Sequence, residues 1–170
     1  HIFLTEYRNV LALLDLLGTR DRLVWETARL IRLTEGAQVT DMRMHPLPPP
    51  LHLAPSFVRV RNLDWHDKVS NLGMVLLGMR IDEELVLRLD EMSAAEMLKR
   101  RRVTQRFIDW FWATACIAVM NVPLERCSAG ALMRVFAQMI GRRQYHIGFA
   151  GDGLAELYVP GAAPSGICTR

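Results

Sequence analysis

The sequence predicts a mostly helical α+β fold with one short β-hairpin. Apolar residues recur at helical spacing in several stretches, and capping residues separate these stretches. One Glu-Gly turn joins two runs of β-capable residues. With 170 residues, 51% of them hydrophobic and 23% charged, the chain has the composition of a globular domain and is long enough to bury a core.

The N-terminal part is expected to form a helix followed by the hairpin. Residues 7–17 place their apolar side chains on one helical face, and Gly18 follows at the position where a left-handed residue often ends a helix. Further on, residues 29–34 and 37–43 flank the turn dipeptide Glu35-Gly36. Because both runs are short and β-capable, we predict an antiparallel hairpin over residues 29–43.

A proline-rich segment and three helices are predicted next. The prolines within residues 46–50 fix φ and remove amide donors, which favours an extended, irregular segment. Asp64 is placed to cap the first helix, and apolar residues every four positions from 81 to 89 indicate the second. Ser93 and Glu96 have the spacing of a capping box that begins the third. The apolar stripe of the first helix comprises Val69, Leu72, Gly73, Leu76 and Leu77.

Residues 104–120 are predicted to form the most informative helix of the chain. The sequence is apolar on nearly every side, which suits a helix that is buried or that lines an apolar cavity. Trp110, Phe111 and Trp112 are consecutive, and successive helical residues are turned by about 100°. We therefore expect at least one of these rings to face a cavity or a partner, although aromatic stripes more often belong to a core.

The C-terminal part is expected to contain one more helix and one strand. Asn121 ends the aromatic helix, and Ser128 caps an amphipathic helix that Gly141 stops. Residues 144–149 have the pattern of a strand, and the glycines of residues 148–153 follow the order GxxGxG. A dinucleotide-binding fingerprint needs GxGxxG between a strand and a helix, so we interpret these glycines as a tight turn.

The sequence contains no recognised catalytic or metal-binding motif. Its five histidines are scattered without HExxH spacing, and neither GxSxG nor GxxxxGK[ST] is present. His52 lies between two leucines after the prolines, and we interpret it as a packed core residue. We therefore name no catalytic residue and no metal ligand, and metal-dependent hydrolysis and nucleotide hydrolysis fit the sequence poorly.

The cysteines indicate the cellular compartment of the chain. Three cysteines without CxxC spacing argue against a disulfide framework and a zinc site, which favours a reducing, cytoplasmic compartment.

The charge and the apolar runs bear on the partners of the chain. The net charge is +3, but the main basic run, residues 99–102, lacks interleaved aromatics. We therefore interpret this run as a solvated helix end and expect no nucleic-acid partner. The longest nearly apolar stretch, residues 110–120, is shorter than the roughly 20 residues that cross a bilayer, so we expect a soluble or peripheral protein.

Two strings of residues resemble a known family. Residues 47–55 read Leu-Pro-Pro-Pro-Leu-His-Leu-Ala-Pro, and residues 119–129 contain Asn-Val-Pro followed by Ser-Ala, behind Phe111-Trp112. In this order and at this distance, they are similar to the squalene-associated branch of the FAD-dependent amine oxidase and phytoene desaturase superfamily, which includes hydroxysqualene dehydroxylase. The likeness covers residues 1–160, and residues 161–170 form an unassigned tail.

The resemblance implies that residues 1–160 are the incomplete, helical substrate-binding region of a flavin amine oxidase-like fold. The implied substrate is an apolar isoprenoid hydrocarbon, squalene or a carotenoid precursor, that the whole enzyme dehydroxylates or desaturates. Family members hold FAD with an N-terminal GxGxxG unit and a C-terminal Gly-Asp segment. This chain has no GxGxxG unit, and Gly151-Asp152, which superficially resembles the Gly-Asp segment, is left unassigned because it follows the Ser128 helix too closely. We expect the chain alone to be inactive, not to retain FAD, and to require the FAD-binding portions of the same protein. The candidate substrate-binding residues are Trp110, Phe111, Trp112, Asn121 and Phe136.

A second interpretation is a non-enzymatic helical module. Its apolar and basic faces would dock on a membrane surface or on a partner protein. Peripheral membrane contact is compatible with both interpretations. An upstream GxGxxG unit in a longer reading frame favours the enzyme, whereas a natural start near His1 favours the module.

Overall fold

The computed structural model describes residues 2–5, 7–26, 31–140 and 146–159, and confirms the mostly helical α+β class. The chain divides into two compact units. Unit 1 comprises His1–Leu30 and Gln144–Arg170, and unit 2 comprises Ile31–Arg143. Both ends of the chain therefore contribute to unit 1, and unit 2 is an insertion within it. No linker pattern in the sequence predicted this division.

Unit 1 is a small antiparallel sheet with two helices. Strands β1 (Phe3–Leu4), β2 (Leu23–Glu26) and β5 (Ile147–Ala150) pair in the order β1-β5-β2. Helix α1 (Arg8–Leu17) contacts helix α10 (Leu154–Tyr158), and a short 3-10 turn, η1 (Arg20–Arg22), leads into β2. The buried core of unit 1 consists of Phe3, Leu11, Leu14, Leu23 and Leu157.

The sequence predicted part of unit 1. Helix α1 is confirmed, since Leu11 and Leu14 are buried and Gly18 ends the helix in the left-handed region at φ +67°. The predicted strand at residues 144–149 overlaps β5, whereas residues 144 and 145 lie outside the described residues. A fold with a single hairpin was an incomplete prediction, because β1 and β2 form a second sheet with β5. These strands are too short for a clear local pattern, and their partner is distant in the sequence.

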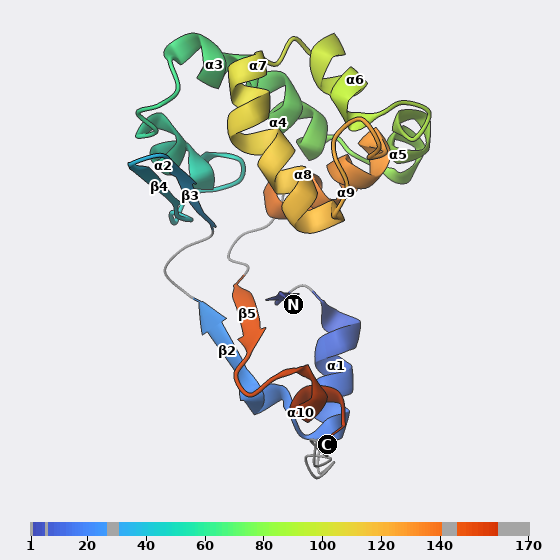
Figure 1. Ribbon diagram of the computed structural model, residues 1–170. Helices are drawn as coiled ribbons and strands as arrows, with labels where there is room; N and C mark the ends of the chain where they lie inside the picture. The colour runs from blue at the N-terminus through green and yellow to red at the C-terminus, as the bar shows by residue number, and fades with distance from the viewer. Residues whose placement is uncertain (1, 6, 27–30, 141–145, 160–170) are drawn as a thin grey trace, which may run out of the picture. The chain divides into compact units, whose positions relative to one another are not determined.

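Unit 2 begins with the predicted hairpin. Strands β3 (Ile31–Glu35) and β4 (Gln38–Met42) pair antiparallel, and Gly36 has a φ of +57°, which favours glycine at this turn. Residues 29 and 30 of the predicted hairpin lie outside the described residues. The hairpin lies beside helix α2 (Ala54–Val58), which follows the 3-10 turn η2 (Leu51–Leu53) (Figure 1). His52 in this turn is buried, as predicted.

The helices predicted in unit 2 are present, and Asp64, Ser93 and Ser128 cap three of them as predicted. The single helix predicted behind Asp64 is divided into two at Asn71. Asp64 and Asp67 make a complete capping box. At Ser93 only the serine half of the predicted capping box is present: the hydroxyl accepts a hydrogen bond from the Glu96 amide, whereas the Glu96 side chain pairs with Arg100. The Ser128 hydroxyl accepts a hydrogen bond from the Ala131 amide. These helices are α3 (Trp65–Ser70), α4 (Leu72–Met79), α5 (Glu83–Leu89), α6 (Ala94–Arg100) and α9 (Ala129–Ile140). Helix α9 contacts α4, α5 and α6 (Figure 1).

The apolar stripe predicted behind Asp64 does not face the core. Val69, Leu72 and Leu76 are exposed, and of the apolar side chains in the predicted stripe only Leu77 is buried. Met74 takes the core position instead. The prediction failed because residues 72–79 are apolar around nearly the whole helix, so that spacing alone does not identify the buried side.

The predicted helix at residues 104–120 is one continuous helical run with a π-helical segment. It consists of α7 (Gln105–Phe107), the π-helix η3 (Ile108–Trp112) and α8 (Ala113–Met120). The Thr104 hydroxyl caps its start by accepting a hydrogen bond from the Phe107 amide. This run belongs to the large core cluster of unit 2 and carries much of its aromatic content.

Candidate functional site

Six aromatic side chains of unit 2 form a connected cluster around the π-helical segment. The ring centroids of Trp112 and Phe136 are 4.4 Å apart, and those of Phe111 and Trp112 are 5.3 Å apart. Phe111 also contacts Phe136 edge to face at 6.2 Å. Such tilted and edge contacts are the favoured geometry for aromatic pairs. The members are Phe57, Phe107, Trp110, Phe111, Trp112 and Phe136.

The structure brings four of the five predicted substrate-binding residues together in this cluster. Trp110, Trp112 and Phe136 are buried, and Phe111 is half-buried at its edge. Asn121 lies apart from the rings, because it is the exposed, left-handed residue that ends α8 at φ +56°. The role of these residues in a substrate tunnel stays a prediction.

A hydrogen bond distinguishes Trp112 from its neighbours. The Trp112 indole N–H donates to the Asn71 side-chain oxygen at 2.9 Å, and both residues are buried. A buried indole N–H needs such an acceptor, so Trp112 serves as a structural anchor between η3 and the α3–α4 connection. Of the three consecutive aromatic residues, Phe111 is the one with appreciable access to solvent.

The hairpin is attached to the helical run through an ion pair. Arg106 on α7 donates two hydrogen bonds to the Glu35 carboxylate, each at 2.5 Å, and the Asn62 amide donates to the same carboxylate. The hydrogen bond from Arg106, and then that from Asn62, lowers the pKa of Glu35 to about 2. Glu35 raises the pKa of Arg106 in turn. The sequence did not predict this pairing, since the partners lie far apart in the chain.

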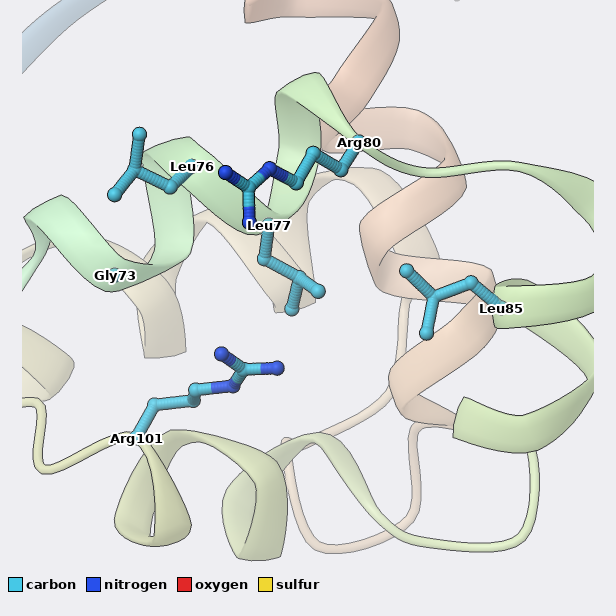
Figure 2. Close-up of a pocket in the computed structure, with 6 residues that line it drawn as sticks. All are labelled: Gly73, Leu76, Leu77, Arg80, Leu85 and Arg101. Atoms are coloured by element: carbon cyan, nitrogen blue, oxygen red, sulfur yellow. The ribbon is translucent and has the colours of Figure 1, made fainter.

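An apolar pocket of about 310 Å³ lies between α4, α5 and the end of α6. Figure 2 shows the guanidinium groups of Arg80 and Arg101 reaching into the same space from opposite sides, with Leu77 and Leu85 pointing into it. None of the predicted substrate-binding residues lines this pocket. The basic run that contains Arg101 was predicted to be a solvated helix end, and no local pattern in the sequence links Arg101 to Arg80. The lining comprises Gly73, Leu76, Leu77, Arg80, Leu85 and Arg101.

A group of potential metal ligands at the start of α3 is accounted for by helix capping. One ligand atom from each of Asp64, His66 and Asp67 lies within 4.8 Å of the others. However, the Asp64 carboxylate accepts a hydrogen bond from the Asp67 amide at 2.8 Å, and the Asp67 carboxylate accepts one from the Thr104 hydroxyl at 2.6 Å. We therefore assign the two carboxylates a structural role, Asp64 in capping α3 and Asp67 in joining α3 to α7.

The glycine-containing bend after β5 does not fit a pyrophosphate-binding loop for FAD. Such a loop directs free backbone N–H groups at the ligand from the start of a helix. Here the Gly151 amide donates to the Arg22 carbonyl at 3.0 Å, and the helix that follows, α10, has only five residues. Arg22 is itself paired with Glu156. These residues fix the strand-to-helix connection of unit 1.

Searches against known proteins add no family assignment. No protein-family model matches the chain, and no curated protein sequence matches it. Among the described residues, no helix is both long and apolar enough to pass through a membrane. The resemblance to the FAD-dependent superfamily therefore stays a prediction from the sequence.

Proposed function

We propose that this chain is the substrate-binding part of an FAD-dependent oxidoreductase that acts on an isoprenoid hydrocarbon. The observation that most supports the proposal is the aromatic cluster on the π-helical segment, which leaves Phe111 half-buried at its edge. Departures from α-helical geometry of this kind are frequent at functional sites. A long hydrocarbon offers no polar group to bind, so aromatic and aliphatic surface is the recognition it requires.

The FAD itself is assigned to other portions of the same enzyme. The Gly151 amide supports this assignment, because it already donates a hydrogen bond to the Arg22 carbonyl and is not free to bind a phosphate. In the proposed enzyme, the residues of this chain orient the apolar substrate and exclude water. Dehydroxylation and desaturation are the two reactions that the sequence resemblance suggests.

Flavin content and turnover test the proposal. The 170-residue chain should be colourless after desalting, whereas a longer protein with an upstream GxGxxG unit should carry flavin and convert squalene-type or carotenoid precursors. A stoichiometric flavin signal in the short chain would contradict the assignment of FAD to other portions. A flavin-loaded longer protein that converts neither class of hydrocarbon would contradict the proposed substrate.

A pair of matched phenylalanine variants tests the role of the aromatic cluster. In the longer enzyme, Phe111→Ala should lower kcat/KM for the hydrocarbon and lower Tm less than a core substitution does, because Phe111 is only half-buried. Phe107→Ala is the control: Phe107 is 1% exposed, and its loss should cost about 3–5 kcal/mol of stability. Equal losses of activity and Tm in both variants would identify the cluster as core only.

A further inference from the structure

Helices α3 and α4 carry an apolar face that no described residue of unit 2 covers. Its members recur at i, i+4, i+7, i+11 and i+14, which is the spacing of one side of a helix. Asn71 separates the two helices at φ −83° and ψ −9°, and the burial of Asp67 on α3 and of Met74 on α4 shows that each helix turns its other side to the core. Each member is at least 45% exposed: Trp65, Val69, Leu72, Leu76 and Met79.

The opposite side of the same helices is occupied by the core of unit 2. Asn71, Met74 and Leu77 are buried there, so the exposed residues are not needed to fold the helices. Large exposed apolar patches on a protein mark sites of interaction with a partner or a membrane. We define the five exposed residues as the α3–α4 face.

Two positive charges border this face. Arg80 follows α4 and Arg101 follows α6, and their guanidinium groups reach into the pocket that Leu76 of the α3–α4 face also lines (Figure 2). Among the described residues, neither side chain has a hydrogen-bond or ion-pair partner. Guanidinium groups bind phosphate through several donors at once, so the pair is suited to a single phosphate between them.

The acidic residues that follow Arg80 in the sequence are engaged elsewhere. Asp82 caps α5 by accepting a hydrogen bond from the Leu85 amide at 2.8 Å. Glu83 pairs with Arg134, and Glu84 lies 3.6 Å from Arg88. None of these three carboxylates forms an ion pair with Arg80, and two of them are paired with other arginines.

We propose that the α3–α4 face docks on an anionic lipid bilayer, with a lipid phosphate bound between Arg80 and Arg101. The apolar side chains would enter the boundary between headgroups and acyl chains, where Trp65 has the favoured side chain for an interfacial position. A second copy of the chain is a poorer occupant, because a two-fold contact brings the same patch together and opposes like charges. This inference does not depend on the proposed enzymatic function.

Vesicle co-sedimentation with the 170-residue chain tests the proposal. The chain should sediment with phosphatidylglycerol–phosphatidylcholine vesicles and much less with phosphatidylcholine alone. Arg80→Ala and Arg101→Ala should each weaken binding about fivefold. Leu72→Glu together with Leu76→Glu should abolish it, while circular dichroism shows an unchanged fold because both leucines are exposed.

The control double variant is Arg59→Ala with Arg126→Ala, which removes the same charge at two exposed arginines elsewhere in unit 2. It should bind vesicles nearly as well as the parent chain. If the control and the Arg80→Ala/Arg101→Ala variant lost the same amount of vesicle affinity, net charge alone would explain the binding. That result would overturn the lipid-phosphate site. Membrane docking would be overturned if the chain failed to sediment with anionic vesicles, or if it bound only a soluble alkyl phosphate. It would also be overturned if the parent chain were a dimer and the Leu72→Glu/Leu76→Glu variant a monomer, because the face would then bind a second copy.

Discussion

Asn71 and Trp112 form a hydrogen bond inside the core of unit 2, where their exposed fractions are 5% and 1%. Leucine at position 71 would leave the indole N–H buried without an acceptor. We expect Asn71→Leu to lower the free energy of unfolding by about 1–3 kcal/mol, measured by urea denaturation. In the Trp112→Phe background the same substitution should cost much less, and an equal cost in both backgrounds would contradict the bond.

The reactivity of Cys116 follows from its environment. Burial, with a smaller contribution from the hydrogen bond to Cys127, raises the pKa of Cys116 to about 12. The thiol is therefore protonated at pH 8, and only the thiolate reacts with alkylating reagents. In a Cys168→Ser background, iodoacetamide should label Cys116 slowly in the native chain and readily in denaturant. Native labelling at the rate of a free cysteine would show that the thiol is accessible.

At the scale of single residues, the sequence predicts helix-capping residues far better than the residues that line a pocket. Asp64, Ser93 and Ser128 were identified because a cap depends on residues three or four positions away. Arg80 and Arg101 were not, since their convergence depends on how α4 and α6 pack. Phe111 falls between these cases: the crowding of three rings predicted that one would be less buried, but only packing determines which.

At the scale of elements, α5 and α9 approach so closely that only glycine fits between them. A Cβ at Gly130 would overlap the Val86 carbonyl and the Asp90 carboxylate. Because one of these is backbone, Gly130→Ala should destabilise the chain by about 1–3 kcal/mol. Gly73→Ala is the matched control, since no atom lies within 4 Å of its Cβ position, and it should raise stability by up to about 1 kcal/mol. Comparable thermal midpoints for the two variants would argue against close packing at Gly130.

The ion pair between the hairpin and α7 should respond to acid. A carboxyl whose pKa is about 2 when folded and about 4.3 when unfolded stabilises the fold above pH 4.3. That stabilisation is lost as the pH falls from 4.3 towards 2. Carboxyl-carbon NMR should show Glu35 titrating well below the other glutamates, and Arg106→Gln should move its pKa back up. A Glu35 midpoint near 4.3 in the parent chain would contradict the pairing.

At the scale of the whole molecule, unit 1 depends on both ends of the chain. Strand β5 is the central strand, and Leu157 belongs to the same core as Leu11 and Leu14. A variant that ends at residue 143 should therefore lose the fold of residues 2–26 and retain unit 2, which has its own core. Amide NMR shifts would distinguish the units, and native shifts for residues 2–26 in this variant would show that β5 is dispensable.

The sequence predicted the helical class and most elements of unit 2, because helical patterns are local. It did not predict the division into units, since the pairing of Leu23 with Ala150 joins residues from opposite ends of the chain. The exposure of Leu72 and Leu76 was also missed, because an all-round apolar helix does not reveal which side its neighbours cover.

The strand register also bears on how such a chain can be rebuilt. Glu26 and Ile147 are partners in the ladder between β2 and β5, so the polypeptide leaves the sheet and returns to it on a single rung. This residue pair is therefore a suitable position at which to delete or replace the insertion. Joining β2 to β5 there through a tight hairpin turn would delete unit 2 as a whole. Inserting another domain between Glu26 and Ile147 would replace unit 2. An insertion exchanged in this way should leave the pairing of β2 with β5 unchanged.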